Sequence, residues 1–427
     1  MTKVTRRSFV LIILSLLLLV GMGIFVYRLY EYGGSWAGFF EYRKFSAEVY
    51  DRNGIPLYVS DGSDGGFAED KLVREACFQI LGDYSGNVEG GILREMRNRL
   101  NRYSFLTGKF ERSPLTLSLD AKLLRASQIA MRDKSGVLIF MNYKTGEILC
   151  SISAPNLDPN EFYEEPPEGA FLNKCLVSSY VPGSVFKLPS LCAALELKPS
   201  IVEEEFFCPG SMIIDGSELN CWDAHGQVDL KEAFASSCNV AFAKFIITLN
   251  KTEYEDLIRG YKVTEPFSID GLHVSGGNFD LVDSGRIGLA WASIGQHKDL
   301  INPLGMLRFL TGVLNQGKMV TPTIIALKEG ENPKFRKIMP ADIADTAKAM
   351  LINNVETYYG AELFHGYEAG AKTGTAELGD DTSNSLFMGF LNSEEYPIAF
   401  ICIIEGGGSG LRTAGAVVSS VLGSYLG

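Results

Sequence analysis

The sequence is poor in histidine and carries a surplus of acidic residues. It has 4 histidines in 427 residues and a net charge of −12. A Ser-His-Asp hydrolase would have to use one of those histidines, and a nucleic-acid-binding protein would need a basic surface. No two cysteines have the Cys-x-x-Cys spacing of many zinc sites, so we predict no metal and no cofactor.

Long hydrophobic runs are also absent, with one exception near the N-terminus. Residues 8–27 contain no charge and are rich in Leu, Ile, Val and Phe. A helix of this length spans about 30 Å, the thickness of a bilayer core. Lys3, Arg6 and Arg7 precede the run, which predicts a single-pass anchor with a cytoplasmic N-terminus and the rest of the chain outside the membrane. A cleaved signal peptide is the alternative, but the run is long for one and lacks a clear cleavage site.

The eight cysteines leave their redox state open. An exported chain permits disulfides. Cys208 and Cys221 flank a polar, turn-rich loop and are the best candidate pair, although two free thiols would fit the sequence equally well. The other six lie mostly in apolar surroundings, which favours buried free thiols; they are Cys77, Cys150, Cys175, Cys192, Cys238 and Cys402.

The chain divides into an anchor (residues 1–29), a small membrane-proximal region (30–114) that we expect to act as a pedestal, and a larger domain (115–427). In the second part, Asn53-Gly54 between two strand-like runs predicts a hairpin, and helical patterns follow at 70–81 and 89–101.

The third part combines strands at its two ends with helices between them. A helical pattern at 121–132 precedes a predicted hairpin, 136–152, whose turn contains Lys144-Thr145-Gly146. Two more strands, 385–391 and 397–405, and a helix at 410–426 end the chain. This order predicts an α+β domain in which helices cover the faces of one antiparallel sheet.

The segment Pro182-Gly183-Ser184-Val185-Phe186-Lys187 places a serine and a lysine three residues apart at the predicted start of a helix. Side chains at this spacing share a helix face, with Cβ atoms about 5–6 Å apart. A desolvated lysine there can lose its proton and act as the base that activates the serine. The pair alone is a weak signal, because Ser and Lys also meet on many solvated helix faces.

Two further motifs follow in the same domain. Ser237-Cys238-Asn239 lies in a helical stretch, and Lys372-Thr373-Gly374 precedes the two terminal strands. The order Ser-x-x-Lys, Ser-x-Asn, Lys-Thr-Gly is the active-site set of penicillin-binding proteins and class A β-lactamases. The earlier Lys144-Thr145-Gly146 falls in a hairpin turn, where we assign Gly146 a turn role.

Residues 115–427 as a whole resemble the transpeptidase domain of class B penicillin-binding proteins. Besides the three motifs, the resemblance rests on residues 116–160 and on His225-Gly226-Gln227-Val228. It implies a monofunctional, membrane-anchored D,D-transpeptidase that cross-links peptidoglycan stem peptides and is acylated by β-lactams. It also implies partnership with a polytopic membrane glycan polymerase.

The resemblance assigns roles to individual residues. Ser184 is expected to attack the D-Ala-D-Ala carbonyl, Lys187 to take its proton, and Ser237 to relay a proton to the leaving amine. Asn239 is expected to hold the donor peptide, although a purely structural helix-bracing role is also open.

The third motif is expected to bind the substrate. Lys372 would supply positive charge, and Thr373, Gly374 and Thr375 would bind the terminal carboxylate. The backbone N–H groups of Ser184 and Thr375 would form the oxyanion hole.

Two departures from the family pattern stand out. Family members commonly carry proline directly after the motif lysine, whereas here Leu188 intervenes before Pro189. Because proline inside a helix kinks it, we expect altered geometry after Lys187. The membrane-proximal region is also short.

Three other functions use the same motifs. A D,D-carboxypeptidase or a β-lactamase would pass the acyl group to water instead of an amine, and a silent β-lactam-binding scaffold or sensor would keep the fold without turnover. The intact motifs argue against the scaffold.

Overall fold

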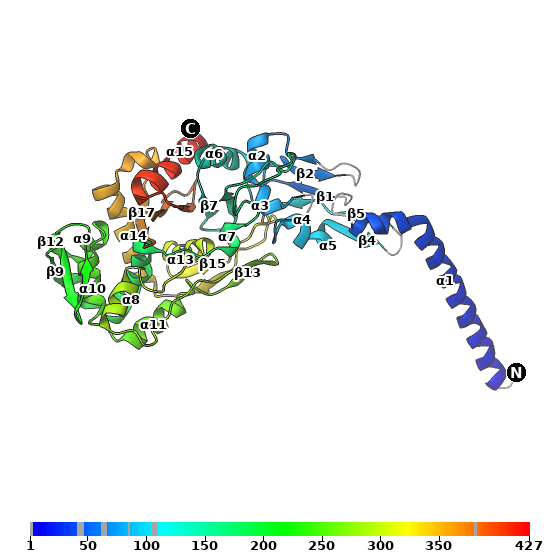
Figure 1. Cartoon of the computed structure of the whole chain (residues 1–427). Helices are drawn as coiled ribbons and strands as arrows, with labels where there is room; N and C mark the ends of the chain where they lie inside the picture. Colours follow the sequence, from blue (N-terminus) through cyan, green and yellow to red (C-terminus); the bar gives the residue numbers. More distant parts are fainter. Residues whose placement is uncertain (1–2, 41–46, 61–65, 84–85, 105–108, 380–381) are drawn as a thin grey trace.

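The computed structural model describes residues 3–40, 47–60, 66–83, 86–104, 109–379 and 382–427. Helix α1 (Lys3–Phe40) extends from one end of the molecule (Figure 1). Within it, Val4–Arg28 is long and apolar enough to cross a membrane, a property that signal sequences share.

The centre of the larger domain is a five-stranded antiparallel sheet in the order β17-β18-β19-β7-β8. Its strands are β7 (Gly136–Asn142), β8 (Ile148–Ala154), β17 (Ala369–Glu377), β18 (Ser383–Leu391) and β19 (Ile398–Ile404). The predicted α+β class is therefore confirmed, including both predicted hairpins. β17, which carries the Lys-Thr-Gly motif, lies at one edge of this sheet.

Helices cover both faces of the sheet (Figure 1). On one face α6 (Ala121–Met131) packs against α15 (Ala416–Leu426), which follows a π-helical turn, Gly410–Gly415. On the other lie α13 (Pro303–Leu314) and α14 (Ala341–Asn354), with α8 (Lys187–Leu197) packed on α14. Because both faces are covered, β19 is buried at every residue, which explains its continuous apolar sequence.

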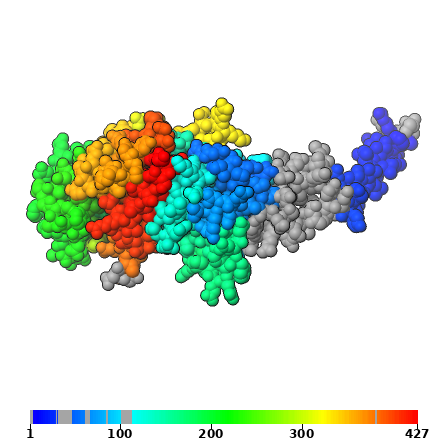
Figure 2. All heavy atoms as spheres, turned by 90° about the horizontal axis from the view of Figure 1, so that it is seen from above, coloured from blue at the N-terminus to red at the C-terminus, as the bar shows by residue number. Residues whose placement is uncertain are grey.

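A separate group of small elements lies at the end of the molecule remote from α1, coloured green in Figure 2. Strand β9 (Glu205–Cys208) pairs with β12 (Gly226–Asp229), and β10 (Ser211–Ile214) pairs with β11 (Ser217–Asn220). Helices α9 (Leu230–Ala235) and α10 (Asn239–Ile246) follow. The Ser-x-Asn motif therefore lies at the junction of α9 and α10.

The 3₁₀ helices Pro199–Glu203 and Ala361–Phe364 and several further short helices and strands complete the domain. The further elements are β6 (Leu115–Thr116), α7 (Lys174–Val177), α11 (Lys251–Gly260), β13 (Phe267–Ile269), β14 (Leu272–Val274), α12 (Arg286–Ser293), β15 (Lys318–Val320) and β16 (Phe335–Lys337).

The membrane-proximal region forms the predicted hairpin, β1 (Ala47–Tyr50) with β2 (Pro56–Ser60), in a sheet of order β3-β2-β1-β6. The predicted helices divide into shorter pieces. The region contains β3 (Gly66–Phe67), α2 (Lys71–Ala76), α3 (Phe78–Leu81), α4 (Ile92–Glu95), α5 (Arg97–Leu100), β4 (Asn101–Ser104) and β5 (Lys109–Arg112).

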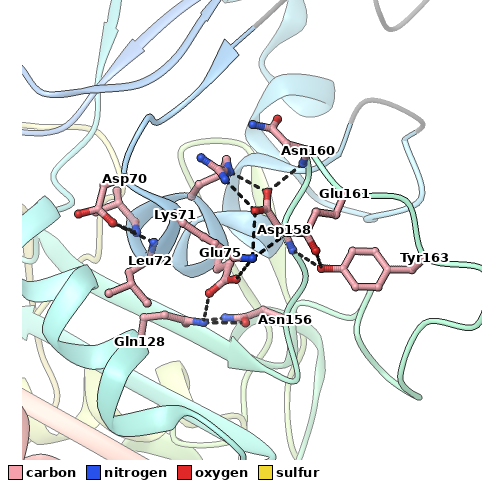
Figure 3. A network of polar contacts seen from close by, with 12 residues as sticks. Asp70, Lys71, Leu72, Glu75, Gln128, Asn156, Asp158, Asn160, Glu161 and Tyr163 are labelled. Carbon is pink, nitrogen blue, oxygen red and sulfur yellow. Dashed lines mark hydrogen bonds and ion pairs between the residues drawn. The ribbon is translucent and has the colours of Figure 1, made fainter.

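This region shares the core of the larger domain. Strand β1 pairs in parallel with β6, α2 packs on α6, and the buried side chains of Leu57 and Val73 belong to the same apolar cluster as Leu123. A polar network reinforces the contact (Figure 3). In it, Arg74 donates two hydrogen bonds, of 2.6 and 2.7 Å, to the buried carboxylate of Asp158. The membrane-proximal region is thus packed against the larger domain and does not hang from it by a flexible linker.

Candidate active site

Ser184 lies in a 3₁₀ turn, Gly183–Phe186, that runs directly into α8. The predicted start of a helix at this motif is therefore correct. The kink expected after Lys187 does not follow, because α8 begins at Lys187 and Pro189 is its third residue. The first residues of an α-helix have no intrahelical acceptor for their N–H groups, so proline is tolerated there.

The side chain of Lys187 is fully buried and contacts both serines and the asparagine of the motifs. Its Nζ lies 2.8 Å from Ser184 Oγ, 3.1 Å from Ser237 Oγ and 2.7 Å from Asn239 Oδ1. It also donates to the Ser237 carbonyl at 2.9 Å. Burial, and then the neighbouring charge of Lys372, hold the pKa of Lys187 well below its ordinary value of 10.5. The neutral amine is the form that can accept a proton from Ser184.

The backbone between α9 and α10 sets the positions of the second motif. Ser237 has a φ of 57°, in the left-handed region that serine rarely adopts. Asn239 is the first residue of α10, and its Nδ2 donates to the carbonyl of Asn220 at 3.0 Å. Asn239 thus connects Lys187 to strand β11.

Lys372, on the edge strand β17, contacts the same serine. Its Nζ lies 3.0 Å from Ser237 Oγ, so Ser237 bridges the two lysines. The side chain is fully buried, and this burial lowers the pKa of Lys372 to about 7. Two lysines close to one hydroxyl create a site in which protons can be redistributed near neutral pH.

β17 packs tightly against the turn that holds Ser184. Gly183 has a φ of +52°, and a Cβ at this residue would lie 2.8 Å from the carbonyl oxygen of Thr375. Glycine is therefore required both by the backbone conformation and by the close approach of the strand. This packing places the Lys-Thr-Gly strand beside the serine.

These residues line one cleft of about 510 Å³. All but two of the predicted site residues line it, namely Ser184, Ser237, Asn239, Thr373, Gly374 and Thr375. The other two, Lys187 and Lys372, lie buried behind it. The structure thus brings together the eight residues that the sequence nominated, while their chemical roles stay predictions.

The structure adds a residue that no motif indicates. The hydroxyl of Tyr359 accepts a hydrogen bond from the Thr373 backbone N–H at 3.3 Å, lies 3.2 Å from Thr373 Oγ1, and is 3.5 Å from Lys372 Nζ. Burial raises the pKa of Tyr359, so the hydroxyl keeps its proton. Tyr359 lies in a π-helical turn, Val355–Tyr359, that follows α14. No local sequence pattern indicates that this tyrosine belongs to the site.

The second Lys-Thr-Gly has the turn role assigned to it. Lys144-Thr145-Gly146 connects β7 to β8, and Gly146 has a φ of 80°. The ammonium group of Lys144 pairs with Glu394, outside the cleft.

All eight cysteines lie in the described part of the chain and are free thiols, so the candidate Cys208–Cys221 disulfide is not formed. Instead, both converge with His225 and Cys238, and the four potential ligand atoms lie within 4.8 Å of one another. These residues could hold a metal ion. The prediction of no metal rested on the absence of Cys-x-x-Cys spacing, and this spacing does not reveal the cluster, because folding brings together residues that lie up to 30 positions apart in sequence.

Residues 136–423 match the family described as "Penicillin binding protein transpeptidase domain". The match covers more than half of the chain.

The chain belongs to the penicillin-binding transpeptidase family.

Two curated relatives fit this assignment. Stage V sporulation protein D of Bacillus subtilis is 26% identical over 314 residues, which are 68% of this chain and 48% of that protein. Peptidoglycan D,D-transpeptidase PbpA of Mycolicibacterium smegmatis is 24% identical over 322 residues, 67% of this chain and 65% of that protein. The chain thus spans about half to two thirds of the length of these relatives.

Solved structures show the same fold. The ceftriaxone acyl-enzyme complex of penicillin-binding protein A from M. tuberculosis superimposes with a TM-score of 0.78 at 20% identity, covering 91% of this chain and 100% of that one. PBP2 of Pseudomonas aeruginosa superimposes with a TM-score of 0.76, covering 90% and 96%. At this identity the likeness establishes the transpeptidase fold alone.

Proposed function

We propose that this protein is a membrane-anchored peptidoglycan D,D-transpeptidase that acts through a serine acyl-enzyme on D-Ala-D-Ala stem peptides and is acylated by β-lactams. The observation that carries the proposal is the contact of 2.8 Å between Ser184 Oγ and the Nζ of a fully buried lysine, Lys187, at the edge of a cleft. Family membership supports the same activity.

In the first half-reaction, Ser184 Oγ attacks the carbonyl carbon of the D-Ala-D-Ala peptide bond, and Lys187 takes the hydroxyl proton. The developing oxyanion is bound by the N–H groups of Ser184 and Thr375. Ser184 is in the first turn of a helix, and β17 is an edge strand. Both kinds of position include N–H groups that have no acceptor within the helix or sheet.

The tetrahedral adduct collapses when the C–N bond breaks and D-Ala leaves with a proton. Ser237 supplies that proton, since its hydroxyl lies 3.1 Å from the Nζ of Lys187, which received it. Ser237 regains a proton from Lys187, and Lys372, while charged, attracts the substrate carboxylate, which Thr373 and Thr375 bind. Asn239 holds the donor peptide. An acceptor amine then attacks the ester and forms the cross-link as the C–O bond to Ser184 breaks, and the proton that the amine loses passes through Lys187 to Ser184 Oγ.

α1 supports single-pass anchoring with the cleft outside the cytoplasm, because Lys3, Arg6 and Arg7 precede its apolar stretch. We also propose a polytopic membrane glycan polymerase as a partner, on the family resemblance alone. Co-purification from a host membrane would test that association, and protease protection of the cleft domain in sealed vesicles would test the topology.

The activity can be tested with a fluorescent penicillin on the detergent-solubilised full chain. We expect covalent labelling of the wild type and of Ser217→Ala, an exposed serine outside the cleft, and none of Ser184→Ala. Equal labelling of Ser184→Ala would exclude Ser184 as the nucleophile. Products formed from a donor stem peptide with and without an amine acceptor then separate transfer from hydrolysis, and hydrolysis alone would identify a carboxypeptidase.

A further inference from the structure

Three cysteines and one histidine from four different places in the chain meet beside the Ser-x-Asn motif. Cys208 ends β9, Cys221 follows β11, His225 precedes β12 and Cys238 caps the N-terminus of α10. Cys208 and Cys238 are fully buried, whereas Cys221 and His225 are half-buried. The mechanism proposed above uses none of these four side chains.

The spacing of the ligand atoms matches a tetrahedral site. Zinc bound at about 2.3 Å to sulfur and about 2.0–2.1 Å to nitrogen requires sulfur atoms about 3.8 Å apart and sulfur–nitrogen pairs about 3.6 Å apart. Cys221 Sγ lies 3.9 Å from Cys238 Sγ and 3.4 Å from His225 Nδ1, and Cys208 Sγ lies 3.7 Å from the same nitrogen. All four ligand atoms lie within 4.8 Å of one another.

The surroundings of the sulfur atoms suit thiolates. The backbone N–H of Asn239 donates to Cys221 Sγ at 3.2 Å, and that of Ala241 donates to Cys238 Sγ at 3.3 Å. Such donors stabilise negative charge on sulfur. The His225 ring is fixed edge-on against Trp222, with centroids 4.8 Å apart, so that Nδ1 faces the thiols.

The cluster is continuous with the catalytic cleft. Cys238 is the middle residue of Ser237-Cys238-Asn239, and Asn239 is held at its N–H by Cys221. Ser237 has the strained φ of 57° that allows its hydroxyl to reach both lysines. Strain of this kind persists only where the surrounding structure fixes it, and a metal bonded to the next residue would do so.

We propose that Cys208, Cys221, His225 and Cys238 bind one zinc ion, and that this ion holds the Ser-x-Asn segment in the conformation needed for acylation of Ser184. Zinc is favoured because three thiolates and one imidazole form a closed structural site for it. The ion takes no part in the chemistry. Its binding is independent of the proposed function, whereas its effect on acylation depends on that function.

Metal content tests the site without reference to activity. The full chain, purified in detergent without added metal and desalted, is analysed for metals by plasma mass spectrometry. We expect about one zinc per chain in the wild type and in Cys402→Ala, which removes a buried cysteine of β19 remote from the cluster. Cys208→Ser, whose thiol contacts neither lysine, should retain less than about a tenth as much. A wild-type chain that contains no zinc and binds none on addition would overturn the proposal.

Two measurements on the wild type test the metal site without relying on variants, which could lose zinc because they misfold. After zinc is removed with dipicolinate under reducing conditions, Co²⁺ should give the visible absorption of a tetrahedral thiolate complex. A disulfide between Cys221 and Cys238 as the purified state, found by peptide mass mapping, would contradict the metal site. Without these signals, the four residues are only a thiol cluster.

The positioning role is tested by the rate of penicillin acylation in the same preparations. Zinc removal should slow labelling of Ser184 at least about tenfold, and added zinc should restore it. Unchanged labelling in zinc-free protein would overturn the positioning role. If no preparation labels at all, the proposed transpeptidase function fails, and the zinc content still decides the site.

Discussion

At the residue scale, the two buried lysines are needed in different protonation states. In the proposed mechanism, Lys187 must be neutral to accept the proton of Ser184, whereas Lys372 must be charged to attract a carboxylate. The pKa of Lys187 is well below 10.5 and that of Lys372 is lowered to about 7. Burial lowers both pKa values, and the charge of Lys372 lowers the pKa of Lys187 further. As pH rises, we therefore expect the base to become active first and the anion-binding charge to be lost afterwards.

This order predicts a bell-shaped pH profile for the second-order acylation rate, with an alkaline limb near pH 7. Lys372→Arg should remove that limb, because a guanidinium stays charged throughout the range. Lys187→Arg should instead slow acylation by about 10²–10⁴ at every pH, since it has no accessible neutral form. The rates are measured with a fluorescent penicillin, and an unaltered alkaline limb in Lys372→Arg would contradict the assignment.

Tyr359 is a positioning residue in this arrangement, because it contacts Thr373 and Lys372. Tyr359→Phe leaves the Thr373 N–H without its buried acceptor, which should cost about 1–3 kcal/mol of folding free energy. Acylation should slow about tenfold as the Lys-Thr-Gly strand shifts. Tyr358→Phe is the matched control, since Tyr358 lines the same cleft and is half exposed. Equal rates in the two variants, measured beside urea unfolding curves, would refute a role for the Tyr359 hydroxyl.

At the element scale, the site depends on how closely the Ser184 turn approaches β17. Gly183→Ala adds a methyl group 2.8 Å from the Thr375 carbonyl oxygen at a φ of +52°. We expect a loss of about 1–3 kcal/mol in stability, together with slower acylation, because the serine turn must move away from the strand.

Gly330→Ala is the control that distinguishes backbone strain from the steric contact between Gly183 and β17. Gly330 has a φ of +82°, and nothing lies within 4 Å of its added Cβ. This variant should lose stability through backbone strain alone and keep the wild-type acylation rate. A similar loss of acylation in both variants would show that the contact of Gly183 with β17 is unimportant.

At the scale of the whole molecule, the Arg74–Asp158 pair connects the membrane-proximal region to the transpeptidase domain. Burial raises the pKa of Asp158, but the hydrogen bonds from Arg74 and from the Asn160 N–H outweigh it, so the net pKa is below 3.8. The stabilisation is therefore complete above about pH 4 and is lost as the pH falls through the folded-state pKa.

Asp158→Asn should lower the unfolding free energy by about 3 kcal/mol at neutral pH, because it leaves the Arg74 guanidinium without its partner. Glu161→Gln, in the same network but half exposed, should change it by less than about 1 kcal/mol. Urea titrations at neutral and acidic pH measure both effects. Equal stabilities of wild type and Asp158→Asn would contradict the structural importance of the pair.

The sequence predicted the sheet and the site where the signals were local or ordered along the chain. Apolar runs at 136–152 and 385–405 indicated buried strands, and the three motifs nominated the eight site residues. Prediction from the sequence failed where a structural feature depended on the residue at which a helix begins or on contacts between residues far apart in the chain. The expectation of a kink at Pro189 was wrong. The effect of a proline depends on its position within the helix, and the 3₁₀ turn before Lys187 sets the residue at which α8 begins.

The sequence by itself determined the α+β class, the apolar N-terminal helix and the chemical identity of the serine and lysine pair, since these follow from periodicity, length and spacing. Only the tertiary structure decided that Tyr359 supports the Lys-Thr-Gly strand, that the membrane-proximal region shares the domain core, and that Cys208, Cys221, His225 and Cys238 converge. These contacts join residues far apart in sequence, and such pairs meet only when packing of the whole chain has closed the loops between them.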